Sequence, residues 1–469
     1  MSQYDLIVIG SGPAGAKGAE EAARLGKTVA LVERAPRLGG AGIATGTVPS
    51  KTLREMAQYL AGLRQRGGYG LEFTLRPELT LGDLMYRRQM VLEAEWGVIQ
   101  RSLDRYRIEV VRGEAALRGP HQVRVRAGDG RTLDLNATVI LLATGSHPYH
   151  PPQIPMDDPR LFDSHSLPAM GRLPRSVVVV GGGVVGAEYA AMFAALGAAV
   201  TLVELQGRLL PPVDGELAER FKRHLEEQGV RVILNEPVVG VDKRHPRLIL
   251  QLQNGEALEC EAALVAAGRQ GNTHGLGLEA AGVAVDEQGY IRVNDRLQTS
   301  VPSIYAAGDV ATRHCFAPIS MEQGRQAALN ALGADAPTRP ALIPQAVYTI
   351  PEIALVGLTE EQCKAQGRPY LVGRAYADQN PRGQITGDTS GLLKLIFSPA
   401  DRTLLGIHLL SEQASELIHI GLHVMASGGT LETFTQTIYN YPTLSALYSQ
   451  AASHGLEVWQ RWRHWQAGQ

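Results

Sequence analysis

The sequence predicts an α/β protein with two Rossmann-like dinucleotide-binding domains and a C-terminal α+β domain. Two observations predict this. A unit of buried strand, glycine-rich turn, helix and strand opens the chain at Tyr4 and recurs from Arg175. After Ile343 the pattern changes to short apolar strands that alternate with helices. The expected divisions are 1–147 and 273–342 for the first dinucleotide-binding domain, 148–272 for the second, 343–453 for the C-terminal domain and 454–469 for a tail.

Composition excludes several classes of protein. The 469 residues are 44% hydrophobic and 20% charged, which is ordinary for a soluble globular protein, and the formal net charge of −2 gives no argument for a nucleic-acid partner. Cys260, Cys315 and Cys363 are too widely spaced for a disulfide scaffold or a metal site. The chain enters a strand at Tyr4–Ile9 without a signal peptide, and no apolar run is long enough to span a bilayer. We therefore expect a cytoplasmic protein without a metal.

The first unit is a dinucleotide fingerprint. Gly10, Gly12 and Gly15 form G-x-G-x-x-G between a strand and a helix, and Glu33 ends the next strand. The glycines allow the tight turn, the approach of a pyrophosphate and close helix–strand packing, while the carboxylate accepts from a ribose hydroxyl. The spacing makes this pattern much more specific than an isolated glycine motif.

The second unit repeats the first with Gly181, Gly183, Gly186 and Glu204. One site per nucleotide implies two cofactors. Glu204 should bind ribose hydroxyls and repel a 2′-phosphate, although Arg208, four residues later, softens that preference.

The remaining segments follow in order. Residues 56–106 should be mainly helical, and the alternation over 107–117 and 122–128 predicts strands of a small antiparallel sheet. A buried strand from Thr138 ends in Ala143-Thr144-Gly145, and a helix should begin near Pro318, after Gly308-Asp309. The tail places Trp459, Trp462 and Trp465 at helical spacing; packing on its own subunit or a partner is favoured over contact with a membrane surface.

The segment from Leu38 to Arg54, LGGAGIATGTVPSKTLR, resembles the flavin-facing segment of the flavoprotein disulfide reductases. Members of that family that use thiols read GG-x-C-x-x-x-x-C-x-P-S-K, and the two cysteine positions here are Gly42 and Thr47. Pro49 and Ser50 predict a turn into a helix that opens near Lys51. The ATG, GRxxN and GD motifs follow in the family's order, so the resemblance covers nearly the whole chain.

This resemblance implies FAD at the first fingerprint, NADH (with NADPH possible) at the second, and a homodimer formed by the C-terminal interface domain. The residues implied for FAD are Gly10, Gly12, Pro13, Ala14, Gly15, Glu33, Arg34, Gly40, Gly46, Thr47, Lys51, Ala115, Ala143, Thr144, Gly145, Gly308, Asp309, Phe316 and Ala317. Those implied for the nicotinamide nucleotide are Gly181, Gly183, Val184, Gly186, Glu188, Glu204 and Gly268.

The thiol machinery of the family has no counterpart here. The family's H-x-H-P-T-x-S-E motif reads YNYPTLSA, which puts Tyr441 at the base position and Ala446 at its carboxylate partner. A tyrosine with a pKa near 10 does not replace a histidine base at neutral pH. Within the family, IYNYPT, QASELIHIG and TGTVPSK resemble the soluble pyridine nucleotide transhydrogenases, which keep one cysteine where this chain has Gly42.

The resemblance also implies that Lys51 and Glu188 pair beside the flavin. A lysine there stabilises negative charge, and the glutamate fixes its position. We therefore expect an FAD-dependent NAD(P)H oxidoreductase that passes electrons directly to a small acceptor: a quinone or dye, a second nicotinamide nucleotide, or dioxygen. Tyr441 of a partner subunit should line an open pocket at Gly42 and Thr47. The alternatives are a transhydrogenase, a non-catalytic redox sensor, and, less favoured, a disulfide reductase using Cys315 or Cys363.

Overall fold

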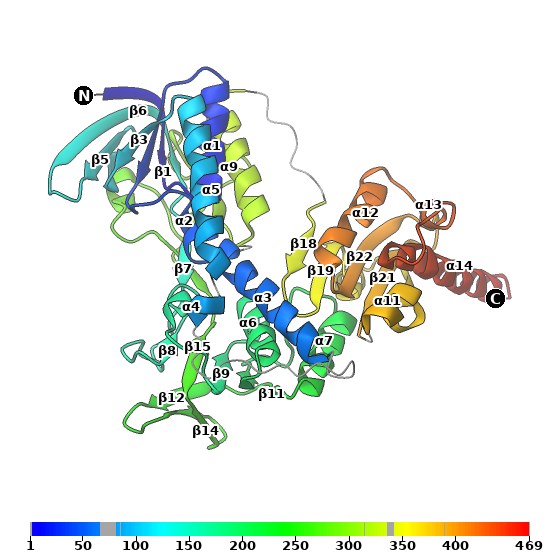
Figure 1. The fold of residues 1–469 in the computed structure, drawn as a ribbon. Helices are drawn as coiled ribbons and strands as arrows, with labels where there is room; N and C mark the ends of the chain where they lie inside the picture. Colours follow the sequence, from blue (N-terminus) through cyan, green and yellow to red (C-terminus); the bar gives the residue numbers. More distant parts are fainter. Residues whose placement is uncertain are drawn as a thin grey trace.

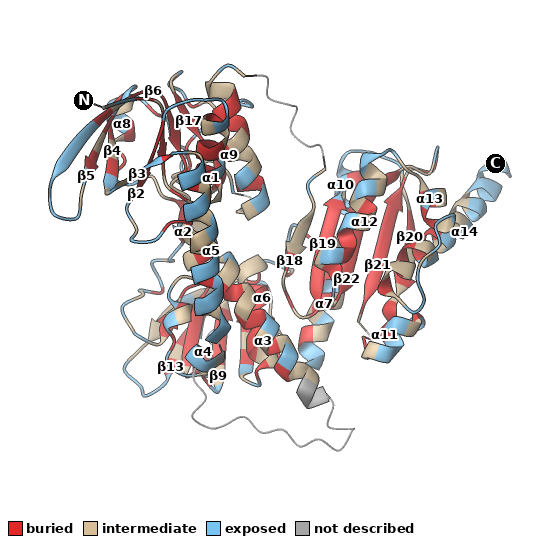
Figure 2. Ribbon diagram, turned by 45° about the horizontal axis from the view of Figure 1, so that its top comes forward, coloured by how far each residue is buried: buried red, intermediate tan, exposed pale blue. Residues whose placement is uncertain are grey.

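The computed structural model describes residues 2–65, 81–84, 86–313, 315–334, 342–388 and 390–468. Figure 1 shows three sheet-containing units, one above another and a third beside them; the long helix α3 (Thr47–Gln65) runs from the junction of the first two along the lower one, next to α6. The strands form the buried centre of each unit, with helices and exposed loops around them (Figure 2). This is the expected α/β architecture. Part of the helical prediction for 56–106, residues 66–80 and 85, falls outside the described residues.

The first unit is built on a seven-stranded sheet in the order β3-β2-β1-β6-β5-β4, with β17 also paired to β6. Its strands are β1 (Ser2–Ile9), β2 (Val29–Glu33), β3 (Glu109–Arg112), β4 (Glu114–Gly119), β5 (Gln122–Arg126), β6 (Thr132–Leu142) and β17 (Ile304–Ala306). Helices α1 (Pro13–Arg24) and α9 (Ala317–Ala331) lie side by side on one face, with α5 (Tyr86–Arg105) next to α1 (Figure 1).

The strands expected to form a separate small antiparallel sheet belong to this larger one. β3 pairs in parallel with β2, whereas β4 and β5 continue antiparallel from β6. The alternating pattern predicted the strands but not their partners. β6, at 11 residues, pairs with β1 over 135–142 along one edge, and along its other edge with β5 over 132–136 and with β17 over 140–142.

The second unit has a parallel sheet in the order β11-β10-β9-β15-β8. Its strands are β8 (Leu161–Phe162), β9 (Ser176–Val180), β10 (Ala199–Val203), β11 (Arg231–Ile233) and β15 (Ala262–Val265), and its helices are α6 (Val184–Ala195) and α7 (Gly215–Glu227). An antiparallel sheet of β12 (Val238–Asp242), β13 (Leu248–Leu252) and β14 (Ala257–Cys260) adjoins it. The chain crosses between the first two units through the paired strands β7 (Ser146–Pro148) and β16 (Arg269–Gly271).

The third unit is an antiparallel sheet in the order β18-β19-β22-β21-β20. Its strands are β18 (Gln345–Val347), β19 (Glu352–Gly357), β20 (Leu371–Tyr376), β21 (Leu392–Phe397) and β22 (Leu404–Ser411). Its helices are α10 (Glu360–Ala365), α11 (Pro381–Thr386), α12 (Ala414–Ala426), α13 (Leu431–Thr435) and α14 (Leu447–Ala467). The smaller helices α2 (Gly40–Ala44), α4 (Leu81–Leu84) and α8 (Leu278–Ala281) complete the described set of α-helices.

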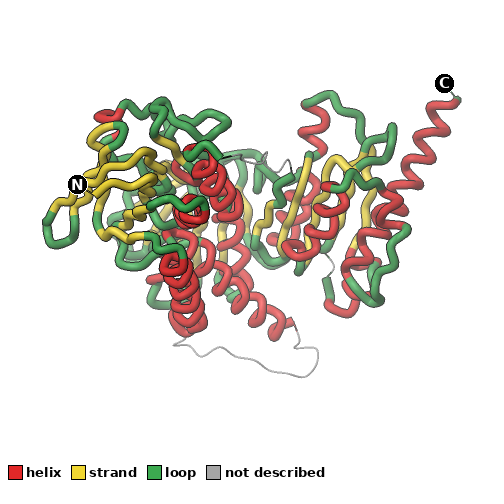
Figure 3. Tube along the Cα trace, turned by 90° about the horizontal axis from the view of Figure 1, so that it is seen from above, coloured by secondary structure: helices red, strands yellow, loops and turns green. Residues whose placement is uncertain are grey.

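The C-terminal tail is the second half of α14, and Figure 3 shows it projecting from the third unit. Trp459 packs on its own chain: its indole N–H donates to the carbonyl of Pro399 at 2.9 Å, and the guanidinium of Arg402 lies 4.4 Å from the ring centroid. Trp465, beyond it, is 59% exposed. Within the described residues, no helix is both long and apolar enough to cross a membrane.

Candidate active site

The first fingerprint is a turn that accepts only glycine at two positions. Gly10 has φ +102°, and a Cβ on it would lie 2.4 Å from the carbonyl oxygen of Ala143. A Cβ on Gly15 would lie 1.8 Å from the carbonyl oxygen of Gly10, which is what draws α1 against the end of β1. A Cβ on Gly12 would meet no described atom within 4 Å, so the approach to the start of α1 is open. Backbone N–H groups at this helix terminus suit a pyrophosphate.

Glu33 ends β2 with its carboxylate held toward the fingerprint. Oε2 accepts from the backbone N–H of Ser11 at 2.9 Å and from its hydroxyl at 2.6 Å, while Oε1 accepts from the N–H of Ala35 at 2.8 Å. The Ser11 hydroxyl also accepts from the N–H of Gly39 at 3.0 Å, which ties the fingerprint to the segment that follows β2. Since a carboxylate has about four acceptor positions, capacity remains for a ribose hydroxyl. Sequence reasoning missed Ser11, which stands at a variable position of the motif.

Asp309 lies where the first unit resumes, in the short helix Gly308–Val310. One of its carboxylate oxygens accepts from the hydroxyl of Ser146 at 3.2 Å and the other from that of Ser320 at 3.1 Å. Helix α9 begins at Ala317, close to the predicted start, and its positive end points back toward this region. Burial, followed by the nearby Asp309 charge, raises the pKa of the Cys315 thiol to about 12. Cys315 is therefore a protonated side chain rather than a nucleophile at neutral pH.

The second fingerprint reproduces the geometry of the first. Gly181 has φ +108° and a Cβ on it would lie 2.4 Å from the carbonyl oxygen of Ala266, while a Cβ on Gly186 would lie 1.8 Å from that of Gly181. Gly183, like Gly12, has no described atom within 4 Å of its Cβ position. The same two backbone approaches thus recur at both predicted sites, and both are shaped to take a dinucleotide phosphate at a helix N-terminus.

The carboxylate of Glu204 is fixed by backbone donors. It accepts from the N–H of Gly182 and, at 2.7 Å, from the N–H of Gln206. Arg208, which was expected to soften the preference against a 2′-phosphate, is engaged elsewhere: its guanidinium donates to the carbonyl of Val213 and lies 3.8 Å from the carboxylate of Glu361. The carboxylate of Glu204 is therefore fixed at the end of β10, whereas the guanidinium of Arg208 points toward the starts of α7 and α10.

The structure brings Lys51 and Glu188 together from different units. The Lys51 ammonium on α3 lies 2.8 Å from the Glu188 carboxylate on α6, with 27% and 6% of the respective side chains exposed. The other carboxylate oxygen of Glu188 accepts from the N–H of Tyr348 at 2.9 Å. The Tyr348 ring centroid is 4.7 Å from the Lys51 ammonium, a cation–π arrangement. Tyr348 follows β18 and was not foreseen as a site residue.

The segment between the first fingerprint and Lys51 folds as two helices. α3 begins at Thr47, four residues earlier than expected, because Pro49 fits the first turn of a helix, where a missing N–H costs no hydrogen bond. A Cβ on Gly40 would lie 2.9 Å from the Cα of Gly12, so this segment passes directly against the fingerprint. A Cβ on Gly42 would lie 3.2 Å from the ring of Pro13, and the Thr47 side chain is exposed.

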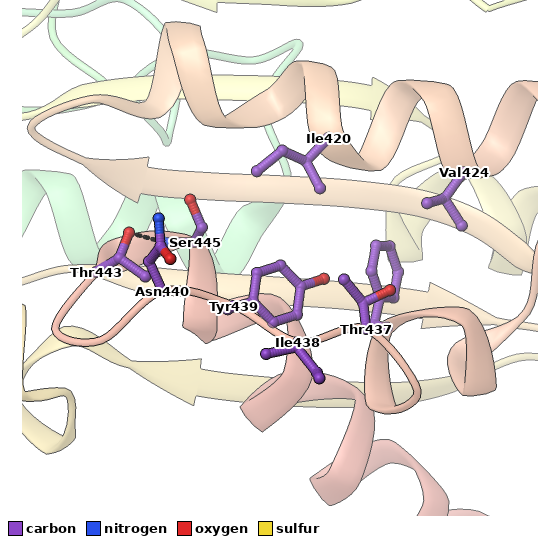
Figure 4. A pocket seen from close by; sticks show the side chains of 9 residues that line it. Ile420, Val424, Thr437, Ile438, Tyr439, Asn440, Thr443 and Ser445 are labelled. Atoms are coloured by element: carbon purple, nitrogen blue, oxygen red, sulfur yellow. Dashed lines mark hydrogen bonds between the residues drawn. The ribbon is translucent and has the colours of Figure 1, made fainter.

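Tyr441 is not part of this cluster within one chain. It is 80% exposed, in the loop between α13 and α14 where Ile438 is 98% exposed. Neighbours in that loop line a surface hollow of about 450 Å³ against α12, shown in Figure 4 with Ile420 and Val424 opposite Tyr439. Within one chain Tyr441 is therefore a surface residue.

The other predicted residues lie around the two fingerprints. Pro13 and Ala14 begin α1, Ala115 is buried in β4, and Phe316 and Ala317 stand at the start of α9. Thr144, Gly145 and Gly268 lie at the crossing between the units, where Thr144 and Asn272 exchange two hydrogen bonds of 2.8 Å. Val184 begins α6, Gly46 donates to the carbonyl of Ala41, and Arg34 is an exposed side chain just after β2.

Comparison with known proteins agrees with this geometry. Residues 4–334 match the pyridine nucleotide-disulphide oxidoreductase family, and residues 343–452 match the dimerisation domain of the same family. The soluble pyridine nucleotide transhydrogenase of Mycobacterium tuberculosis is 42% identical over 453 residues, covering 96% of this chain and 97% of the relative. That of Colwellia psychrerythraea is 35% identical over 97% and 98% of the two chains.

Solved structures show the same likeness. The HOCl-induced flavoprotein disulfide reductase RclA from Escherichia coli, as its Cu(II) complex, superposes with a TM-score of 0.86 at 30% identity, over 97% of this chain and 99% of that one. LpdA from Mycobacterium tuberculosis superposes with a TM-score of 0.87 at 28% identity over the same shares. The dimerisation-domain match supports a homodimer. The chain thus belongs to the pyridine nucleotide-disulphide oxidoreductase family and is an FAD-dependent enzyme that uses NAD(P)H.

Proposed function

We propose that this protein transfers hydride between two pyridine nucleotides by way of FAD, without a redox disulfide. The observation that carries the proposal is the pairing of Lys51 with Glu188 in a chain that has Gly42 and Thr47 at the family's two cysteine positions. FAD held by the residues of the first fingerprint would supply the chemistry of accepting and donating a hydride. A chain without a dithiol beside the cofactor has no thiol relay, so the nucleotide site serves both half-reactions in turn.

The residues of the site have separate tasks in this proposal. Lys51 holds a positive charge where negative charge develops, and Glu188 fixes its position. The backbone N–H of Tyr348 in turn fixes Glu188. Gly181, Gly183 and Gly186 admit the nucleotide phosphates, and Glu204 receives a ribose. On the FAD side, Glu33 and Asp309 are the corresponding carboxylates.

Relatives favour hydride exchange over a quinone or dye as the main acceptor. The transhydrogenase name recurs among relatives from 35% to 42% identical that align with nearly the full chain. The match to a family of oxidoreductases also argues against a non-catalytic redox sensor. Quinone or dye reduction is the second candidate. At the family's two cysteine positions Gly42 has no side chain and Thr47 is exposed, so a flat acceptor would have space there. Dioxygen is the third acceptor that the site permits.

The domain division given above is part of this proposal. Residues 1–147 and 273–342 would hold FAD, residues 148–272 would hold the nicotinamide nucleotide, and residues 343–453 would join two subunits. The proposal places the enzyme in the cytoplasm, where both nucleotide pools are available.

An anaerobic assay tests the proposal. NADH is mixed with a thionicotinamide analogue of NAD⁺ or NADP⁺, whose reduced form absorbs at a distinct wavelength. We expect turnover with parallel double-reciprocal plots, as a shared site requires. If neither analogue is reduced, while NADH turns over with an added quinone or, in a parallel aerobic assay, with dioxygen, the proposal is overturned in favour of the corresponding acceptor.

A further inference from the structure

Tyr348 contacts both members of the Lys51–Glu188 pair through different groups. Its backbone N–H donates to one Glu188 oxygen at 2.9 Å, and its ring centroid stands 4.7 Å from the Lys51 ammonium. The ammonium also donates to the other Glu188 oxygen at 2.8 Å. The three groups therefore form a closed triangle in which Tyr348 fixes the lysine directly through its ring and indirectly through the glutamate.

The position of Tyr348 is itself fixed by the next turn of α3. Arg54, three residues after Lys51, is 3% exposed and donates from Nε to the carbonyl of Thr349 at 3.3 Å. Its guanidinium also lies 3.0 Å from the buried carboxylate of Glu352 at the start of β19. The segment from Tyr348 to Glu352 is thereby bound to the same helix that carries Lys51, one helical turn further along.

We propose that Tyr348 is a positioning residue for hydride transfer, whose ring holds the Lys51 ammonium in its place beside Glu188, where the two dinucleotide-binding units meet. A lysine side chain has many rotamers, and the two hydrogen bonds of the ammonium, to Glu188 at 2.8 Å and to the hydroxyl of the adjacent Ser50 at 3.3 Å, leave its flexible stem some freedom to turn. An aromatic face below the charge removes this freedom and attracts the cation. The third unit thus supplies a part of the reaction centre from within the same chain.

The ring, rather than the hydroxyl, should carry this role. Burial raises the pKa of Tyr348, and the charges of Glu352 and Glu188 raise it further. The phenol therefore stays neutral at neutral pH, and the ring keeps its ordinary quadrupole. Tyr348→Phe keeps the aromatic ring, whereas Tyr348→Met keeps an apolar side chain but removes the ring. The inference rests on the proposed role of Lys51.

The experiment compares Tyr348→Phe, Tyr348→Met, Lys51→Met and the Lys51→Met/Tyr348→Met double variant. Stopped-flow reduction of bound FAD by NADH should be about as fast in Tyr348→Phe as in the parent and about 5- to 30-fold slower in Tyr348→Met, the fold-change that loss of a partly desolvated cation–π contact gives. The flavin midpoint potential should fall in Tyr348→Met in the same direction as in Lys51→Met. The double variant should be no slower than Lys51→Met alone, because Tyr348 acts through the lysine.

A second readout does not depend on turnover. In apo-protein carrying ¹³C-dimethylated lysines, the Lys51 signal, assigned with Lys51→Arg, should show the ring-current shift of Tyr348 and lose it in Tyr348→Met. Tyr376→Met, which removes a ring that faces Arg220 at 5.2 Å, is the matched control and should leave both readouts unchanged. If Tyr348→Met holds no FAD, the apo-protein signal decides.

The outcomes distinguish the proposed role of the Lys51–Glu188 pair from the positioning role of Tyr348. Fast reduction in Lys51→Met would overturn the proposed role of the pair. Three other outcomes would overturn only the positioning role of Tyr348. The first is slow flavin reduction in Lys51→Met with fast reduction in Tyr348→Met. The others are a Lys51 signal without the ring-current shift, and additive slowing in the double variant.

Discussion

The ammonium of Lys51 lies 2.8 Å from the carboxylate of Glu188, and this contact joins residues 137 positions apart in the sequence. Lys51 belongs to the long helix after the first fingerprint, while Glu188 lies within the helix of the second. The pair therefore exists only where two dinucleotide-binding units meet, which is where a hydride would pass from one cofactor to the other.

Removing this charge should weaken the reductive half-reaction without emptying the FAD site. We expect Lys51→Met to slow flavin reduction by NADH about tenfold or more, and to lower the flavin midpoint potential by roughly 30 mV or more, since a loss of about 1.4 kcal/mol of stabilisation corresponds to these values. Stopped-flow absorbance and a dye-equilibration titration measure the two effects. Lys222→Met, which removes a surface ion pair on α7, is the control and should match the parent.

Nucleotide choice should depend on Glu204. The Gly182 and Gln206 N–H groups fix its carboxylate, so a 2′-phosphate placed there meets a like charge. We expect Glu204→Ser to raise the NADPH-to-NADH ratio of kcat/KM about tenfold, equivalent to about 1.4 kcal/mol. Glu226→Ser, which removes a charge on the outer part of α7, should leave the ratio unchanged. An unchanged ratio in Glu204→Ser would remove this residue from nucleotide selection.

The cysteines should be silent in the redox reaction. Burial raises the pKa of Cys260 to about 11 and that of Cys315 to about 12, and it also raises the pKa of Cys363. All three thiols are free and protonated at neutral pH. We expect reductive titration to consume two electrons per chain and iodoacetamide at pH 7.5 to leave activity intact. A four-electron end point or a thiolate-to-flavin charge-transfer band would contradict the disulfide-free chemistry.

A buried ionic cluster should control how stability varies with pH. Lys394, 1% exposed, contacts the carboxylates of Asp214 at 2.7 Å, Glu216 at 2.9 Å and Glu360, and so joins the second unit to the third. Burial acts to raise the pKa of Glu216 and Glu360, but hydrogen bonds from Lys394, and from Arg374 to Glu216, hold both below the ordinary value.

Lys394→Met should therefore destabilise the fold most at neutral pH. Carboxylates with lowered pKa values stabilise the folded state above their unfolded pKa, near 4.5, and lose that contribution as pH falls through the folded value. Removing the buried cation should cost about 3–5 kcal/mol at pH 7, where the carboxylates are left unpaired, and less below pH 4, where they take up protons. Denaturant unfolding at both pH values, with Lys222→Met as control, measures the difference. An equal loss at both would show that packing rather than charge is responsible.

The sequence predicted the parts of the site that depend on local spacing. Gly10, Gly15, Gly181 and Gly186 were predictable because each must bring two backbones within contact distance, and no other residue permits that. The start of α3 at Thr47 was less predictable, since Pro49 suits both a turn and the first turn of a helix.

Residues that act across units escaped prediction. Tyr348 lies 160 positions from Glu188, and its contact with that carboxylate is made by a backbone N–H, which every residue except proline possesses. Its ring meets Lys51 only once β18 lies beside α3. The sequence around Lys394 did not indicate its role either. This lysine of the apolar strand β21 meets Asp214 and Glu216 only where the second unit contacts the third, and Glu360 comes from the start of α10. Arg208 illustrates the opposite case: its spacing from Glu204 suggested that it would soften the preference against a 2′-phosphate, but its guanidinium contacts the carbonyl of Val213 and lies near the carboxylate of Glu361.

The last prediction concerns the flavin-facing segment, where the family's cysteines would stand. Hydride exchange at a single nucleotide site needs Lys51 of this segment but gives the positions of Gly42 and Thr47 no part in the reaction, whereas a quinone or dye that stacks on the opposite face needs the space at these two positions open. Gly42 is close to Pro13, with 3.2 Å from an added Cβ to the ring, so Gly42→Trp forces a bulky ring out into this space. Thr47 is exposed, and Thr47→Trp fills the space from the start of α3.

We expect both tryptophan variants to keep NADH-to-thionicotinamide exchange within about threefold of the parent, since the nucleotide side is untouched, and to reduce quinones or dyes at least about tenfold more slowly. Gly128→Trp is the matched control, because an added Cβ there meets no described atom within 4 Å. Loss of both activities together, with FAD still bound, would mean that the two acceptors share one face. Loss of nucleotide exchange with quinone reduction intact would instead place the second nucleotide at Gly42 and Thr47, and the single-site account would have to be abandoned.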